Sequence, residues 1–465
     1  MKGIMQKISK DTSQQKDRAE PENYAGGQTF IWITENNLTN ADQPKEGMLE
    51  QILSPMNLNR AYKRVKGNKG KGGIDKMEVE SLKEYLVNQK DELIQSILEG
   101  KYRPNPVRRV EIPKENGKMR QLGIPTVVDR VVQQAIMQVL SPIYERQFSN
   151  RSYGFRPKRS AHQALNQCID DISIGYQYAV DMDMEKFFDT VNQSKLIEVL
   201  SRTVKDGRVI SLIHKYLNAG VVVRNKYEET EMGVPQGGPL SPLLSNIMLN
   251  ELDKELEKRG HQFVRYADDM VTLCKSERSA HRTLTSITSY IENKLYLKVN
   301  REKTVVAHIS KIKFLGYSFY INERGARLRV HPKPIDKMKA RIKELTSRSN
   351  GMGDEKRKES LRHFIIGWVN YFKLADMKSL LQRVDEWYRR RLRMVIWKQW
   401  KRIRTKLRNL IKLGINKYKA WEYANTRKGY WRIANSPILS KTVTNDRLKR
   451  AGYIFFADYY RKVKV

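Results

Sequence analysis

Apolar and polar positions alternate with two different periods in the middle of the chain. Residues 263–273 form an apolar stretch interrupted by two adjacent carboxylates, Asp268 and Asp269, and this pattern predicts a tight hairpin of two short strands. Residues 178–189 begin as an alternating strand and then become helix-like, and residues 243–252 form an apolar helical run. Since strand-like runs alternate with longer helical ones from about residue 104 to residue 330, we predict an α+β fold for this region.

Other patterns flank this core on both sides. Residues 1–48 lack a clear period and are expected to form a poorly ordered leader. Residues 49–103 contain two amphipathic helical stretches, joined by a flexible loop at residues 66–73 that is rich in glycine and lysine. Lys69 and Lys71 in that loop are candidate phosphate contacts, and a solvated connector explains them equally well. From residue 331 onward helical periodicity dominates.

The helical C-terminal part carries a strong positive charge. No acidic residue occurs in residues 387–421, where apolar residues recur at three- and four-residue steps and give the segment a face that can dock. A solvated face would mix both signs of charge, so cations alone favour contact with phosphates. The candidate contacts are Arg389, Arg390, Arg391, Arg393, Lys398 and Arg402.

Aromatic residues interleave with these cations. Aromatic rings stack on unpaired bases in nucleic-acid-binding proteins, although rings at helical spacing also serve as core residues. We expect at least half of the following to be buried: Trp387, Tyr388, Trp397, Trp400, Trp421, Tyr423, Tyr430 and Trp431.

The charge of the whole chain indicates a polyanionic partner. Lys and Arg number 88 against 51 Asp and Glu, which gives a formal net charge of +37. No apolar run approaches the roughly 18 residues of a membrane-spanning helix, and the N-terminus has no signal-type apolar core, so we expect no membrane partner and a cytoplasmic location. Cys168 and Cys274 lie far apart, which argues against a disulfide framework or a structural zinc site.

Adjacent carboxylates at a hairpin turn suggest a metal site. Two such groups repel each other, and a divalent cation can supply the compensating charge. A polar turn is the alternative, because Asp is a favoured turn residue. Asp183 follows a strand-like run, and a carboxylate at such a strand end points into a cleft. Asp181 shares a face with Asp183 in an extended strand, so it competes for the same role.

The order of the motifs is more specific than any single one. Together they resemble those of reverse transcriptases, most closely the reverse transcriptase/maturase proteins encoded within group II introns. The motifs that carry the resemblance are Gly123-Ile124-Pro125-Thr126, Asp129-Arg130, Tyr153-Gly154-Phe155-Arg156-Pro157, Asp183 with Phe188, Pro235-Gln236-Gly237, Tyr266-Ala267-Asp268-Asp269, Lys303-Thr304 and Phe314-Leu315-Gly316-Tyr317.

The resemblance implies a right-hand polymerase. Residues 49–103 would be an N-terminal extension and residues 104–330 the fingers and palm with an antiparallel sheet. Residues 331–400 would be a helical thumb or maturase domain, and residues 401–465 a small basic helical DNA-binding domain. Some relatives continue into an endonuclease domain with CxxC pairs; these pairs are absent here, so we expect the lineage without that domain.

The resemblance also implies a two-metal active site. Asp183 and Asp268 would bridge two Mg²⁺ ions, with Asp269 as an auxiliary ligand, and carboxylates without His or Cys suit Mg²⁺. We choose Asp183 over Asp181 because Phe188, five residues on, matches the family position beneath the sugar of the incoming nucleotide, where an aromatic wall would exclude a 2′-hydroxyl.

Further residues would bind the deoxynucleoside triphosphate. Lys114 and Arg120 flank a predicted hairpin turn and resemble the family's phosphate-contacting pair. Gln236 would touch the nucleotide or the template base, and Lys303 is a candidate acid for the leaving pyrophosphate.

The expected function is therefore RNA-directed DNA synthesis on an RNA template with a DNA primer, combined with binding of the group II intron RNA to assist its splicing. Copying the intron into a DNA target would serve its mobility. Two alternatives remain: a related reverse transcriptase outside any intron, and an RNA-binding splicing factor without polymerase activity.

Overall fold

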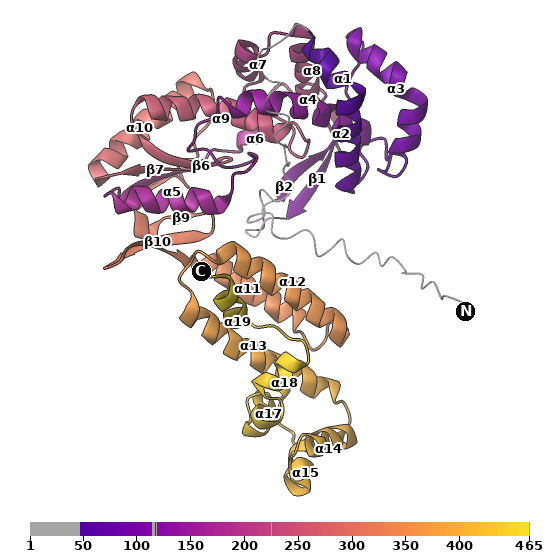
Figure 1. Ribbon diagram of the computed structural model, residues 1–465, viewed down its shortest axis with the longest axis vertical. Helices are drawn as coiled ribbons and strands as arrows, with labels where there is room; N and C mark the ends of the chain where they lie inside the picture. Colours follow the sequence, from indigo (N-terminus) through magenta and orange to yellow (C-terminus); the bar gives the residue numbers. More distant parts are fainter. Residues whose placement is uncertain (1–46, 114–116, 118, 225, 465) are drawn as a thin grey trace. The chain divides into compact units, whose positions relative to one another are not determined.

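The computed structural model describes residues 47–113, 117, 119–224 and 226–464, except for the side chain of Arg120. The chain forms two compact units, Met1–Ile312 and Lys313–Val465 (Figure 1). The sequence placed the end of the core at residue 330, whereas the strands of residues 313–330 belong to the second unit. Residues 1–46 of the expected leader lie outside the described residues.

The first unit combines helices with two four-stranded sheets. Its helices are α1 Met48–Leu53, α2 Pro55–Gly67, α3 Leu82–Leu98, α4 Val127–Glu145, α5 Ala161–Ser173, α6 Phe187–Thr190, α7 Gln193–Thr203, α8 Gly207–Leu217, α9 Ser241–Lys258 and α10 Glu277–Lys294. Its strands are β1 Val107–Pro113, β2 Met119–Ile124, β3 Tyr178–Met182, β4 Val221–Val223, β5 Lys226–Glu228, β6 Gln262–Tyr266, β7 Asp269–Cys274 and β8 Val305–His308. The predicted α+β class is confirmed.

The sheet that carries the acidic motifs has the order β6-β7-β3-β8, with antiparallel neighbours throughout. Helix α10 packs against β3, β7 and β8, and α5 and α9 pack against β6 (Figure 1). The predicted hairpin is β6–β7, and the predicted strand-to-helix segment is β3 followed by α6. Because helices cover the sheet, most residues of β6 and β7 are buried.

The second sheet of this unit has the order β2-β1-β4-β5. Strands β1 and β2 form the predicted hairpin, with Pro113 opposite Met119 at its end. Strand β4 pairs with β1 in parallel, so this sheet is mixed rather than purely antiparallel.

The N-terminal helices differ from the prediction in two details. The first predicted stretch splits at Ser54, whose hydroxyl accepts a hydrogen bond from the amide of Asn57 and caps α2. The glycine-rich loop is anchored rather than flexible at its end: Arg108 donates to the carbonyl of Gly72 (2.8 Å), and a Cβ on Gly73 would come within 2.6 Å of the Cα of Thr126.

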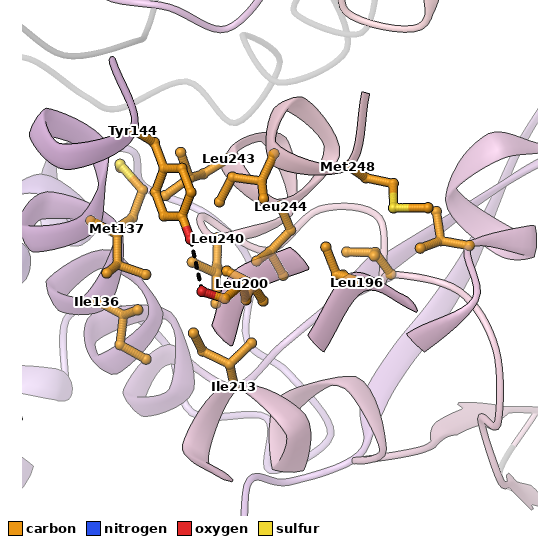
Figure 2. Packing of buried hydrophobic residues seen from close by; sticks show 14 of the residues in the cluster. Ile136, Met137, Tyr144, Leu196, Leu200, Ile213, Leu240, Leu243, Leu244 and Met248 are labelled. Carbon is orange, nitrogen blue, oxygen red and sulfur yellow. Dashed lines mark hydrogen bonds between the residues drawn. The ribbon is translucent and has the colours of Figure 1, made fainter. Parts of the chain in front are cut away.

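One continuous apolar core runs through the first unit. Figure 2 shows part of it, where side chains of α4, α7, α8 and α9 interdigitate. Tyr144 is buried there, and its hydroxyl donates to the carbonyl of Leu200 (3.3 Å), so the ring packs without leaving its polar atom unpaired. This core fixes α9, which in turn positions the acidic hairpin described below.

The second unit is mainly helical. Its strands are β9 Lys313–Phe314, β10 Tyr317–Asn322 and β11 Gly325–Val330, in the order β11-β10-β9. Its helices are α11 Pro332–Leu345, α12 Asp354–Phe372, α13 Lys378–Gln399, α14 Ile403–Lys412, α15 Lys417–Ala424, α16 Tyr430–Ile433, α17 Pro437–Thr442, α18 Asn445–Arg450 and α19 Phe456–Val463. Helix α19 packs on α12 and α13. The predicted basic helical segment is broken at Trp400–Arg402 between α13 and α14.

Candidate active site and nucleic-acid interface

Three aspartates lie at or next to the ends of the two inner strands of the β6-β7-β3-β8 sheet. The antiparallel ladder between β3 and β7 ends at the pair Met182–Met270. One residue further along each strand lie Asp183 and Asp269, and Asp268 is the adjacent residue of the β6–β7 turn. Side chains at neighbouring cross-strand positions lie about 5 Å apart at Cβ. The sheet register therefore places Asp183 and the Asp268-Asp269 pair at the same end of strands β3 and β7, although they are far apart in the sequence.

The turn that carries Asp268 has an unusual backbone. Ala267 adopts a left-handed φ of 58°, a region that costs a residue with a Cβ roughly 1 kcal/mol. Ala267 is buried, whereas Asp268 and Asp269 are exposed. Such a conformation persists only where surrounding contacts fix it.

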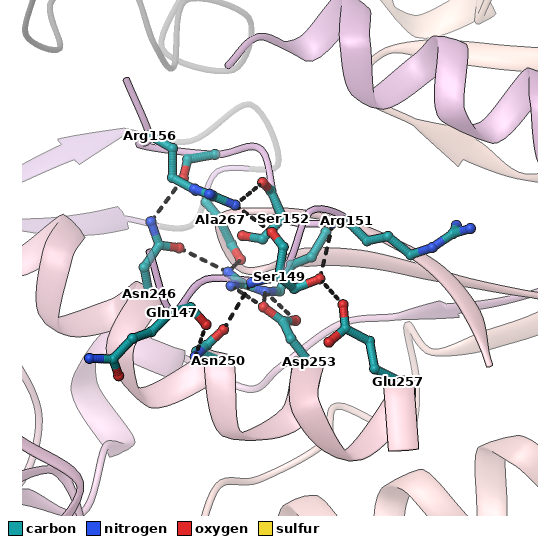
Figure 3. Close-up of polar contacts among 12 residues, drawn as sticks. Gln147, Ser149, Arg151, Ser152, Arg156, Asn246, Asn250, Asp253, Glu257 and Ala267 are labelled. Carbon is teal, nitrogen blue, oxygen red and sulfur yellow. Dashed lines mark hydrogen bonds and ion pairs between the residues drawn. The ribbon is translucent and has the colours of Figure 1, made fainter. Parts of the chain in front are cut away.

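Arg265 supplies one of these contacts. Its side chain is fully buried, and Nη1 donates to the carbonyl oxygen of Ala267 (2.9 Å) (Figure 3). Nε and Nη2 donate to the two carboxylate oxygens of Asp253 (2.8 and 2.6 Å), and Nη1 also donates to Asn246 (2.9 Å). Asp253 and Asn246 lie seven residues apart on one face of α9. Burial raises the pKa of Asp253, and the guanidinium of Arg265 opposes that rise.

Gly154 supplies the other contact. A Cβ at this position would overlap the backbone nitrogen of Ala267, and the carbonyl of Gly154 accepts from the side chain of Asn246 (2.9 Å). The amide of Tyr153 donates to the carbonyl of Arg265 (2.8 Å). Sequence reasoning missed the role of Arg265, although an arginine inside the apolar run Phe263-Val264-Arg265 signals a buried partner.

The backbone of Asp183 is held by the segment that follows α10. Its amide donates to the hydroxyl of Thr304 (3.3 Å), and its carbonyl accepts from the amide of Asn300 (2.9 Å). Lys303 in the same segment lies with Nζ 3.3 and 3.4 Å from the two carboxylate oxygens of Asp183. The structure thus brings the predicted acid Lys303 directly to the carboxylate edge. Asp181, the competing aspartate, pairs within the ladder opposite Val271 and Val305.

The chemistry of these donors suits a hard divalent cation. Exposed carboxylates are acceptor-only oxygen ligands, and neither His nor Cys is adjacent in the turn. Within the described ranges, no three acidic, His or Cys side chains are gathered tightly enough to hold an ion. The ammonium of Lys303 provides the positive charge beside Asp183 in this arrangement.

Phe188 is joined to the Pro235-Gln236-Gly237 loop through the backbone. Its carbonyl accepts from the amide of Val234 (2.6 Å), and a Cβ on Gly233 would lie 2.8 Å from that oxygen. The ring is half-buried and packs edge-on against the buried Phe187, with centroids 5.3 Å apart. Phe188 therefore keeps part of its ring exposed, five residues after Asp183 in the sequence.

Gln236 lies where this loop touches strand β2. Its carbonyl accepts from the amide of Gly123 (2.7 Å), and a Cβ on Gly237, which has a φ of 109°, would collide with the carbonyl of Gly123. Its side-chain oxygen is buried and has no hydrogen-bond partner within the described part of the chain.

A polar groove of about 470 Å³ lies next to these elements. It is lined by Arg109 and Gln121 of the β1–β2 hairpin, by Lys186 and Asp189, and by residues 228–232. Of the predicted phosphate-contacting pair on this hairpin, Lys114 and the side chain of Arg120 lie outside the described residues. Lys69 and Lys71 are exposed.

The basic residues of α13 divide into two groups. Arg391 is buried. It donates hydrogen bonds to the hydroxyl of Thr346 and, over 3.0 Å, to the carbonyl of Lys343 at the end of α11. The prediction that Arg391 faces nucleic acid is therefore wrong. It satisfies the last carbonyls of α11 instead. Arg390 stacks on Trp431 (3.9 Å to the ring centre), and Arg393 donates to the carbonyl of Val443 (3.0 Å).

The remaining predicted contacts keep more solvent exposure. Arg402 is exposed, Arg389 and Lys398 are half-buried, and each of the latter two lies over a ring, Phe455 and Tyr430 respectively. Exposed cations further along α14 and α15 add to this surface. None of the helices in the described ranges has the length and apolar character needed to span a membrane.

The fold and the acidic edge define a reverse transcriptase. Residues 112–319 match the family model described as reverse transcriptase (RNA-dependent DNA polymerase), and residues 335–414 match the group II intron, maturase-specific domain. The chain belongs to the group II intron-encoded reverse transcriptase/maturase family. Members of the reverse transcriptase family use divalent metal ions, and nucleic acid is the partner that both matched domains imply.

The chain is similar to individual known proteins. Protein YkfC of Escherichia coli (strain K12) is 33% identical over 311 residues, which cover 58% of this chain and 82% of YkfC. The group II intron-encoded protein LtrA of Lactococcus lactis subsp. cremoris is 31% identical over 362 residues, which cover 63% of this chain and 60% of LtrA. Among solved structures, a partial Cas6-RT-Cas1–Cas2 complex matches at 26% identity with a TM-score of 0.35, covering 53% of this chain and 42% of that chain.

Proposed function

We propose that this protein copies RNA into DNA by two-metal nucleotidyl transfer and that it also binds a group II intron RNA to assist its splicing. The observation that supports the catalytic part is the sheet register, which puts Asp183 and the Asp268-Asp269 turn at the same end of β3 and β7, with the turn anchored by the buried Arg265. A turn fixed in this way keeps its carboxylates preorganised for the reaction.

Asp183 and Asp268 would hold a pair of Mg²⁺ ions, with Asp269 as the auxiliary ligand. When bound, such ions lower the pKa of the primer 3′-hydroxyl and neutralise the leaving pyrophosphate. Lys303, whose Nζ lies 3.3 Å from Asp183, would protonate the leaving group.

Selection of the nucleotide is assigned to the elements around α6. The half-buried ring of Phe188 would contact the sugar and exclude a 2′-hydroxyl, and Gln236 would contact the nucleotide or the template base. Lys114 and Arg120 remain the proposed contacts to the triphosphate.

The splicing role is assigned to nucleic-acid binding by the basic surfaces. RNA is recognised by shape, phosphates and unpaired bases, so a protein can stabilise the active RNA fold by affinity alone. The match of residues 335–414 to the maturase-specific domain supports the intron RNA as ligand, and a DNA target would serve intron mobility.

Primer extension on an RNA template with Mg²⁺ tests the catalytic part. We expect the Asp268→Asn, Asp269→Asn double variant to lose extension while it still assists splicing of the host intron. Extension by the double variant at the parental rate would refute the catalytic assignment. Loss of both activities with an unchanged melting temperature would refute the separation of the two roles.

Two other functions predict different observations. An RNA-binding splicing factor without polymerase activity would assist splicing and extend no primer. A reverse transcriptase from outside any intron would extend primers, and a folded intron would be absent from the nucleotide sequence that flanks its gene.

A further inference from the structure

Helices α14 and α15 form a small pair in the second unit. The two helices are in contact with each other. The buried residue of α14 is Leu410, and the buried residues of α15 are Ala420 and Ala424. Because these residues are small on the α15 side, the two helices approach closely and the larger side chains of α15 lie at the margin of the contact. Helix α15 falls outside both ranges that match family models.

A pocket of about 430 Å³ opens between these helices. Its lining is apolar where it is accessible, and it is formed by Leu407, Asn416, Lys417, Tyr418 and Trp421. Tyr418 and Trp421 are three residues apart on one helical face, so their rings are neighbours. The pocket therefore has two adjacent aromatic walls.

These two rings differ from the other aromatic residues of the basic region. Tyr388 and Trp397 are buried, with exposed fractions of 0% and 2%, and Trp431 lies against the guanidinium of Arg390. Tyr418 and Trp421 keep 75% and 59% of their area exposed. A pair of large exposed rings beside an apolar pocket marks a binding surface rather than a core.

The charge around the pocket identifies the occupant. The sequence contains one acidic residue, Glu422, in residues 387–445. Exposed cations on and next to the two helices are Lys401, Arg402, Arg404, Arg408, Lys412, Lys417 and Lys419. A polyanion is attracted to such a surface, and an anionic chain with accessible flat apolar groups would also fill the pocket.

We propose that the α14–α15 pair binds a single-stranded segment of nucleic acid, with unpaired bases stacked on Tyr418 and Trp421 and phosphates held by the surrounding cations. Bases of a duplex are stacked on one another and cannot enter such a pocket, whereas every unpaired base has a free face. This inference rests on the proposed nucleic-acid-binding function and specifies the state of the strand that this surface takes.

Equilibrium binding of labelled oligonucleotides to the full chain tests the proposal. The probes are one DNA strand, the RNA of the same sequence and the blunt DNA duplex, all at the same salt concentration. We expect Tyr418→Ala and Trp421→Ala each to weaken binding of the single strands about tenfold, while duplex binding changes less than about twofold. Trp421→Phe retains most of the affinity because it keeps a stacking face.

Ile411→Ala is the matched control. Ile411 is a 43% exposed apolar residue of the same helix pair that does not line the pocket, so its removal should leave all three affinities unchanged. A fluorescent base analogue in the DNA strand adds a spectroscopic readout, because stacking quenches its emission. We expect Trp421→Ala to reduce that quenching at saturating protein.

Equal losses for single strands and duplex, or no loss in the Tyr418→Ala and Trp421→Ala variants, would refute the proposal and leave a protein partner as the occupant of the pocket. If the two variants lose more affinity for the RNA strand than for the DNA strand, or the reverse, stacking is supported, and the strand with the larger loss is the one that this surface prefers. The proposed function is tested separately, since the parental chain must bind nucleic acid and extend a primer whatever these variants do.

Discussion

At the residue scale, the turn that carries Asp268 depends on neighbouring groups that hold its backbone in place. Ala267 occupies a left-handed conformation, Gly154 leaves room for its backbone, and Arg265 binds its carbonyl oxygen. Because Asp253 and Asn246 share the same guanidinium, the position of the turn is coupled to helix α9. Breaking a buried pair of this kind typically costs 3–5 kcal/mol, so the network also stabilises the first unit.

Gly154→Ala tests the positioning role without removing a charge. The added methyl group meets the backbone nitrogen of Ala267, which cannot rotate away, so the turn must shift. We expect the kcat of primer extension to fall about tenfold or more, with a smaller change in the KM for nucleotide, since a displacement of about 1 Å is enough for such losses. Steady-state kinetics at saturating Mg²⁺ provides the measurement.

Gly207→Ala is the control for this variant, because a Cβ at Gly207 meets no atom within 4 Å and its φ is not positive. It should leave kcat unchanged. If Gly154→Ala keeps the parental kcat, the predicted dependence of kcat on the exact position of the β6–β7 turn is wrong.

Phe188 carries a second prediction at this scale. Its ring leans on Phe187 and its backbone is fixed by Val234, so truncation of the side chain should open space without moving the loop. We expect Phe188→Val to increase incorporation of ribonucleotides relative to deoxynucleotides by at least about tenfold. Competition between the two nucleotide types in primer extension measures the ratio, and an unchanged ratio would remove Phe188 from the sugar-selecting role.

At the element scale, the sequence predicted what periodicity and punctuation specify. The β6–β7 hairpin, the β3 strand with its following helix and the apolar helix α9 all occur where the pattern indicated them. The anchored loop at Gly72–Gly73 and the burial of Arg391 were not predictable, because both depend on residues distant in the sequence, Thr126 and Thr346. A run of arginines does not reveal which of them fold back onto a helix end.

The docking of α19 is another element that periodicity alone did not predict. Asp385 on α13 is buried, and its carboxylate accepts the amides of Phe456 and Ala457 (3.0 and 2.9 Å) at the start of α19. Burial raises the pKa of Asp385 to about 6, against an ordinary value near 3.8, while the backbone donors oppose the rise. At a pH between these two pKa values, Asp385 therefore keeps its proton in the folded state and loses it in the unfolded state.

Asp385→Asn should remove this pH dependence. The pKa of Asp385 is higher in the folded state than in the unfolded state. Its contribution to the free energy of unfolding is therefore fully present below about pH 4 and is lost as the pH rises through about 6. The loss amounts to about 3 kcal/mol. We expect the free energy of unfolding of the variant, relative to the parent, to rise across this range in urea titrations.

Asp446→Asn, at an exposed aspartate of α18, is the control for this effect and should keep the parental profile. A constant difference between Asp385→Asn and the parent from pH 4 to pH 7 would contradict the raised pKa.

At the scale of the whole molecule, the net charge of +37 predicts a partner but not its contact points. The structure divides the cations: Arg391 satisfies carbonyls of α11, whereas Arg402 is exposed beside the α14–α15 pair. Only cations that meet phosphates release counterions on binding, so the two groups differ in their effect on salt dependence.

The slope of log affinity for RNA against log salt concentration measures this division. Arg402→Gln should reduce the magnitude of the slope by about 0.7 to 0.9, the value for one lost phosphate contact, with little change in the melting temperature. Arg391→Gln should leave the slope unchanged and instead lower the melting temperature, because it leaves the buried end of α11 without its donor. A reduced slope in Arg391→Gln would show that Arg391 does contact RNA. Its hydrogen bonds to the end of α11 would then have to open when RNA binds.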